Sequence, residues 1–172
     1  RVSADINNNE GGSGALFELE DAYVAWNCGE YFDAMMGNFK PNASRSNSVD
    51  PENLLFIDRT AIGSALDFWD NGVGAKGTWE QLMWSVAVMN GSGSSGGGHT
   101  RDHLYVLRAL WNLGNGAGDM DGARGSSDTL NGTIGISFIN DDTVTTTGGN
   151  SDHDMWLVDA HGSMSNLGFG GE

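Results

Sequence analysis

Residues 81–90, QLMWSVAVMN, alternate strictly between two kinds of position, and this stretch decides the fold class. The bulkier apolar side chains fall on one set of alternate positions: Leu82, Trp84, Val86 and Val88. Smaller or more flexible side chains fall on the other set: Met83, Ser85, Ala87 and Met89. A period of two sustained over residues 82–89 is typical of a β-strand and is hard to obtain from a helix. The stretch therefore predicts a strand with two chemically different faces.

The same alternation recurs on both sides of this stretch. We expect further strands at residues 1–6, 15–26, 31–38, 72–77, 103–113, 130–139, 153–161 and 167–172. Segments rich in Gly, Asn, Ser and Asp separate these runs, and 27 glycines against two prolines fit a protein with many tight turns. The predicted fold class is all-β, an antiparallel up-and-down arrangement of about eight or nine strands. Helix is expected only as a turn or two within residues 51–66.

Composition excludes several classes of function. The chain has 172 residues, which is one domain or a piece of one. Eight Lys and Arg and a net charge of −15 exclude the clustered positive charge that nucleic acid requires. The single cysteine, Cys28, excludes an internal disulfide framework. The chain opens in strand-like alternation, so we expect that any targeting segment is missing or was removed.

The strands could face their apolar side toward a soluble core or toward lipid. In a transmembrane barrel the apolar face meets lipid and the inner face is polar. Small and polar residues fill the opposite faces of several runs, as at Ser85, Thr133, Gly135 and Ser137. Aromatic residues stand near the ends of the runs: Trp26, Trp79, Tyr105, Trp111, Phe138 and Trp156. Together with the alternation of short turns and longer loops, these features favour a transmembrane β-barrel.

Five short blocks resemble the phosphate-selective porin O and P family. They are residues 20–26 (EDAYVAW), 37–41 (GNFKP), 55–60 (LFIDRT), 72–77 (GVGAKG) and 84–91 (WSVAVMNG). Each block is short, so the resemblance rests on their common order and spacing. It implies an outer-membrane porin, usually a trimer, in a Gram-negative-type bacterium. Such a barrel passes small polar solutes or ions, including anions such as phosphate, and contacts membrane lipid.

The resemblance also gives the chain a place within such a barrel. Residues 1–172 would be one β-barrel domain, or the central portion of a larger porin-type barrel of about 16 strands. Both ends of the chain fall within predicted strands, which agrees with a portion. Residues 39–66 would fold into the lumen as a constriction loop, with residues 54–57 anchored against the inner wall.

The resemblance implies a set of pore-lining residues on and near this loop. We expect Lys40, Arg45, Asp58, Arg59 and Arg108 to line the passage, the basic ones as contacts for an anion. Alternatively, Arg59 pairs with Asp58 or with a carboxylate of the wall and only holds the loop. The chain departs from the family pattern in having FKPN for FKPP and no ladder of Arg and Lys. A general or cation-preferring pore is therefore at least as well supported as a phosphate-selective one.

Other chemistry finds little support in the sequence. His99 and His103 have a spacing that suits a metal only on a helix, and here they flank a glycine-rich loop entering a strand. We expect no cofactor; the weak candidates for a calcium ion are Asp119, Asp121 and Asp128. There is no enzyme signature. The alternative function, of a different class, is a secreted acidic β-rich binding or surface-assembly module that could depend on calcium.

Overall fold

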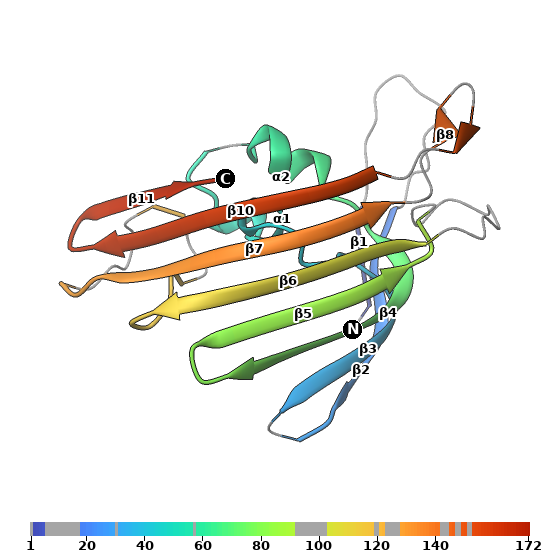
Figure 1. Ribbon diagram of the computed structural model, residues 1–172, viewed down its shortest axis with the longest axis horizontal. Helices are drawn as coiled ribbons and strands as arrows, with labels where there is room; N and C mark the ends of the chain where they lie inside the picture. Colours follow the sequence, from blue (N-terminus) through green and yellow to red (C-terminus); the bar gives the residue numbers. More distant parts are fainter. Residues whose placement is uncertain are drawn as a thin grey trace.

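The computed structural model describes residues 2–5, 18–29, 31–56, 58–91, 103–118, 121–122, 128–141, 145–146, 149–150 and 153–172. Its main element is one nine-stranded antiparallel sheet whose strands lie in chain order (Figure 1). The strands are β1 (Val2–Asp5), β2 (Glu18–Asn27), β3 (Phe32–Phe39), β4 (Asp70–Trp79), β5 (Leu82–Met89), β6 (Leu104–Leu113), β7 (Asn131–Asp141), β10 (His153–Met164) and β11 (Leu167–Gly171). A separate two-stranded sheet pairs β8 (Thr145–Thr146) with β9 (Gly149–Asn150).

The all-β, up-and-down prediction is confirmed, and every expected strand is present with small shifts at its ends. β4 begins at Asp70 rather than at residue 72, and β5 follows it across a turn at Glu80, where φ is 53°. A left-handed residue at such a tight turn matches the right-handed twist of the paired strands. The sheet is open, with β1 and β11 at its two edges, and is consistent with a portion of a porin-type barrel.

The convex, outer face of the sheet is apolar and exposed. Strand alternation places Trp84 and Val88 on the same face as Val86, which is 38% exposed. It likewise places Phe138 beside Ile134 and Ile136, which are 48% and 46% exposed. Further exposed members of this outer face are Val24, Trp26, Met36, Val73, Leu107, Trp111, Trp156 and Val158. A continuous exposed apolar band marks a surface that another apolar phase covers, which favours the transmembrane arrangement over a soluble sandwich.

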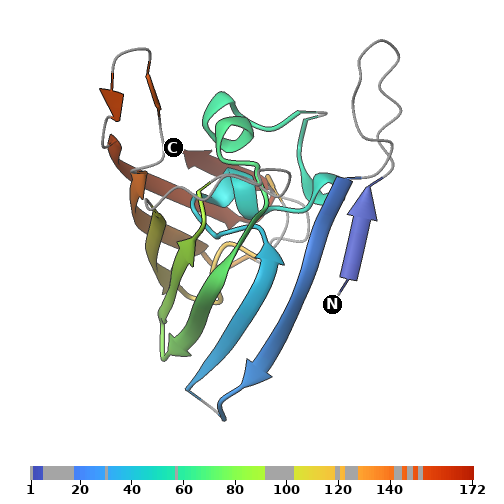
Figure 2. The same ribbon diagram turned by 90° about the vertical axis from the view of Figure 1, so that its right-hand side faces the viewer.

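The concave, inner face is covered by the connection between β3 and β4, residues 40–69, which we call the inward segment (Figure 2). It contains α1 (Arg45–Ser48), the 3-10 turn η1 (Pro51–Asn53) and α2 (Ala61–Ala65). Ala43 and Leu66 of the segment are buried in a small core with strand residues of the inner face. Those strand residues are Phe39, Ala87, Met89, Leu104, Val106, Ile139 and Leu157. No helix in the described ranges is long and apolar enough to cross a membrane.

The expected anchor of the inward segment at residues 54–57 is contradicted at Leu55 and Phe56. Leu55 and Phe56 are 62% and 77% exposed, and residue 57 lies outside the described residues. The segment instead anchors through Ala43 and Leu66, close to the two points where it leaves and rejoins the sheet. Residues near these two points lie against the wall because the strands fix them there, whereas the middle of a long connection is free to project.

A glycine in β3 lets the neighbouring strand approach closely. Gly37 has a φ of 136°, and a Cβ there would overlap the carbonyl oxygen of Ala22 and lie 2.7 Å from the Cα of Tyr23. We expect Gly37→Ala to lower the free energy of unfolding by about 1–3 kcal/mol from backbone strain alone. The matched control is Gly171→Ala, where a Cβ meets nothing within 4 Å. Urea unfolding in detergent, followed by tryptophan fluorescence, measures both; equal stability of the two variants would contradict the packing argument.

Candidate functional site

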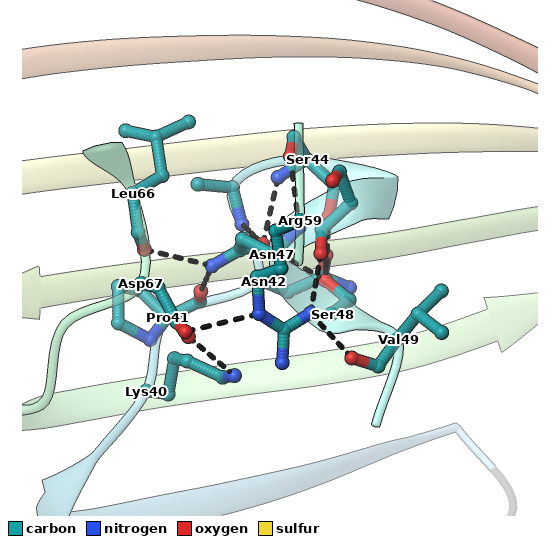
Figure 3. A network of polar contacts seen from close by, with 12 residues as sticks. Lys40, Pro41, Asn42, Ser44, Asn47, Ser48, Val49, Arg59, Leu66 and Asp67 are labelled. Atoms are coloured by element: carbon teal, nitrogen blue, oxygen red, sulfur yellow. Dashed lines mark hydrogen bonds and ion pairs between the residues drawn. The ribbon is translucent and has the colours of Figure 1, made fainter. Parts of the chain in front are cut away.

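Asn47 ties the two ends of the inward segment together. Its side chain is fully buried and accepts hydrogen bonds from the backbone N–H groups of Ala43, at 3.2 Å, and Ser44, at 2.9 Å. Its Nδ2 donates to the carbonyls of Pro41 and Leu66, both at 3.0 Å (Figure 3). These four bonds to the backbone use both donors of the amide, and Oδ1 also accepts from Ser48 Oγ at 3.0 Å. The entry and exit of the segment are thereby held together without any side chain of the wall.

Asp67 joins two basic side chains of the same segment. Its carboxylate is 2.8 Å from Lys40 Nζ and 3.0 Å from Arg59 Nε (Figure 3). The Arg59 side chain is only 7% exposed and also donates to the carbonyls of Ser46 and Val49. Arg59 thus satisfies the C-terminal carbonyls around α1 while Asp67 balances its charge. Lys40 Nζ additionally lies 4.9 Å from the centre of the Trp69 ring.

Arg108 fastens the inward segment to the wall. It projects from β6 and forms a buried ion pair with Asp159 of β10, with 2.7 Å between Nη1 and Oδ2 and exposures of 1% and 2%. Arg108 Nη1 also donates to Ser137 Oγ of β7 at 2.8 Å and to the carbonyl of Ala43 at 3.1 Å. Residue 135 of β7 is glycine, and a Cβ there would lie 2.9 Å from both charged groups. One guanidinium therefore links two strands of the wall to the segment.

The last residue of the chain contacts the helices of the inward segment. Glu172 accepts a hydrogen bond from the backbone N–H of Ser46 at 2.6 Å and from Thr60 Oγ1 at 3.1 Å. Ser46 and Thr60 are themselves joined, Oγ to Oγ1, at 3.0 Å. Thr60 also caps α2 by accepting from the N–H of Gly63. These bonds fix α1 and α2 relative to the end of β11.

A cavity of about 820 Å³ lies between the inward segment and the wall formed by β2 to β6. Its charged lining residues are the carboxylates Glu20, Asp21, Asp50, Glu52 and Asp67 and the basic residues Lys40, Arg59 and Lys76. A water-accessible space of this size, lined by charged groups on the inner face of the sheet, suits small hydrophilic solutes. It is the candidate site.

The structure brings together some of the predicted pore-lining residues and separates others. Lys40 and Arg59 line the cavity and share Asp67, whereas Arg108 is buried in its ion pair with Asp159. The remaining two predicted residues lie elsewhere on the segment: Arg45 Nε is 3.9 Å from Asp121, and Asp58 is exposed. The partner of Arg59 is a carboxylate of the segment itself, neither Asp58 nor a wall residue. That any of these residues contacts an ion stays a prediction.

Sequence reasoning missed the residues that hold the site in shape. Asn47 carries a readable signal, since Ser44 and Asn47 form a capping box around the first turn of α1. Asp67 and Asp159 carry no such signal, because Asp67 lies 27 residues from Lys40 and Asp159 lies 51 residues from Arg108. The pairing of β6, β7 and β10 brings Asp159 to Arg108, and the course of the inward segment brings Asp67 to its partners.

The calcium candidates are not gathered by the structure. Asp119 lies outside the described residues, Asp121 faces Arg45, and Asp128 is exposed with Ser165 Oγ at 3.5 Å. Among the residues that the structure describes, no group of three or more His, Cys, Asp or Glu is placed to hold a metal ion. His99 also lies outside the described residues. A calcium site therefore stays a prediction from sequence.

Comparison with known proteins gives one match. The family model described as phosphate-selective porin O and P matches residues 1–156. No curated protein and no solved structure matches the chain.

Because Arg108 and Asp159 form a buried ion pair, removing one of the two charges should destabilise the fold more than removing both. Arg108→Met would leave a buried carboxylate without its counter-charge, and we expect a loss of about 3–5 kcal/mol in the free energy of unfolding. The double variant Arg108→Met with Asp159→Leu removes both charges and should recover at least half of that loss. Chemical unfolding in detergent measures both; a double variant less stable than the single one would rule out the uncompensated charge as the cause.

The hydrogen bonds of Asn47 lead to a separate prediction, about how fast proteases cleave the inward segment. Asn47→Asp keeps an acceptor for the N–H groups of Ala43 and Ser44 but removes both donors to the carbonyls of Pro41 and Leu66. We expect the segment to loosen and protease cleavage within residues 40–69 to become at least several-fold faster, because unpaired buried carbonyls cost about 1–3 kcal/mol each. Asn42→Asp is the control on the same segment. Cleavage at the wild-type rate in both variants would show that Asn47 does not close the segment.

Proposed function

Because the chain belongs to the phosphate-selective porin O and P family, we propose that it is a porin through which small polar solutes and ions diffuse passively. The observation that carries the proposal is the inverted distribution of polarity across the sheet. The outer face is an exposed apolar band, whereas the inner face combines a small apolar core with buried charges, hydrogen-bonded polar groups and a charged cavity. A β-sheet with this distribution suits lipid on its outside and water on its inside. The proposed role is passage, not catalysis.

We propose the outer membrane of a Gram-negative-type bacterium as the location. The outer face supplies apolar side chains for contact with lipid tails, and Trp26, Trp111 and Trp156 on it are 74%, 51% and 67% exposed. Aromatic side chains with a polar edge suit the boundary between lipid and water. Association into a trimer is part of the proposal through the family resemblance.

We propose that the inward segment narrows the passage, as expected for residues 39–66. Its support is geometric: the segment covers the inner face and is held by the four bonds of Asn47, the Asp67 pairs and Arg108 (Figures 2 and 3). A segment held at so many points keeps a fixed position relative to the strands it covers. A fixed constriction selects solutes by size and by the charges that line it.

The support for phosphate as a solute of this chain is the description of its family. An anion passing the cavity would meet Lys40 and Arg59, both of which are already engaged by Asp67. The substrate class supported by the chain itself is therefore small polar solutes and ions in general.

Reconstitution tests the proposed function directly. The full chain should require detergent for extraction, migrate differently on gels before and after heating, and produce discrete conductance steps in planar lipid bilayers. A lysine at the outward-facing Ile136 should weaken insertion by about 2–4 kcal/mol if the residue is near the bilayer midplane. A lysine at the inward-facing Met83 is the control and should be tolerated. A monomer that is freely soluble without detergent and shows no conductance would refute the proposal.

A further inference from the structure

We infer that the passage beside the inward segment favours cations over anions, with Asp50 and Glu52 as the residues that set this preference. The inference rests on the proposed porin function and adds the class of ion. It concerns the cavity between the segment and the wall of β2 to β6, and both carboxylates line that cavity. It follows from how the charges of the inner face are distributed between buried pairs and open surface.

The basic side chains expected to attract an anion are held in place by other groups. Lys40 and Arg59 share Asp67, and Nη1 of Arg59 donates to two backbone carbonyls. Arg108 is 1% exposed in its pair with Asp159. An anion could bind these groups fully only if it displaced a carboxylate at 2.7–3.0 Å, which opposes the binding by like-charge repulsion.

Asp50 and Glu52 differ from these residues in both exposure and pairing. Both side chains are exposed, both line the cavity, and neither forms an ion pair with another described residue. They flank Pro51 on η1, which is part of the inward segment. Asp50 is the N-cap residue of η1, and its side chain makes no capping hydrogen bond there. Two such carboxylates on a constriction are positioned to attract a partly hydrated cation.

Lys76 is the residue that argues for the opposite preference. It is exposed, lines the same cavity from β4, and has no ion pair among the described residues. Its partner across the sheet is Asp33 of β3, which places a carboxylate beside it on the inner face. Opposite charges at directly facing positions attract each other and weaken the pull of Lys76 on a passing anion.

The balance of charge around the cavity is negative. Asp67 forms ion pairs with both Lys40 and Arg59, so these three residues together carry one net positive charge. Among the described residues the lining nevertheless holds five carboxylates against three basic residues, and Arg59 is 7% exposed whereas Asp50 and Glu52 are both exposed. A cleft lined by excess charge of one sign concentrates ions of the other sign. The cavity should therefore hold more cations than anions.

Reversal potentials under a KCl gradient measure this preference in reconstituted bilayers. We expect a permeability ratio of K⁺ to Cl⁻ of roughly two or more for the wild-type protein at low ionic strength. The double variant Asp50→Asn with Glu52→Gln should bring the ratio to about one, since it removes two exposed charges and no ion pair. Lys76→Gln should move the ratio in the other direction. Glu80→Gln, a carboxylate in the β4–β5 turn, is the control and should leave the ratio unchanged.

The outcomes separate this inference from the proposed function. If the wild-type protein conducts with a K⁺ to Cl⁻ permeability ratio at or below one, the cation preference is overturned and the proposed porin function is not. A ratio above one that the Asp50 and Glu52 changes do not alter overturns the assignment to these residues. Absence of conductance in the wild-type protein overturns the porin function itself, and the inference with it. A ratio above one that falls in the double variant and not in the control supports the inference.

Discussion

The structure depends on how buried charge is balanced on the inner face of the sheet. A strand sends alternate side chains to opposite faces, so a sheet with its apolar side outward must place its polar side inward. Arg108 and Asp159 meet this constraint by pairing across β6, β7 and β10, with Gly135 leaving the space they need. The same guanidinium donates to the Ala43 carbonyl, so the charge pair that satisfies the wall also positions the inward segment. The Arg108 guanidinium thus contacts the wall and the segment at once.

The inward segment joins a small apolar core and is otherwise held by directional bonds. Ala43 and Leu66 are its buried apolar contacts with the wall, while Asn47, Asp67 and Glu172 supply the remaining attachments. Hydrogen bonds and ion pairs have strict geometry, whereas apolar contacts between side chains can slide. A segment held this way keeps one position relative to the strands. That rigidity is what a passage of constant width requires, and it explains why the middle of the segment can expose Leu55 and Phe56.

The sequence predicts the strands well and the contacts inside the sheet poorly, for different physical reasons. The period-two pattern is local, and residues 82–89 reveal both the strand and its two faces without knowledge of any partner. The pairs Arg59–Asp67 and Arg108–Asp159 are set by the register between strands and by the course of a long connection. Arg59 stands next to Asp58 in sequence yet bonds to Asp67, because the turn of α2 brings Asp67 back to it. Neighbours in sequence are therefore a weak guide to ionic partners here.

Family membership and local charge lead to different expectations about the permeating ion, and the geometry explains why they can differ. The family match rests on most of the chain, and so on the pattern that builds the sheet and places the inward segment. Ion preference depends instead on a few exposed charges, which can change without any effect on strand alternation or packing. In this chain the basic residues of the segment bind carboxylates, and exposed carboxylates remain on η1. An architecture can therefore persist while its exposed charges change, and the proposed cation preference assigns that change to Asp50 and Glu52.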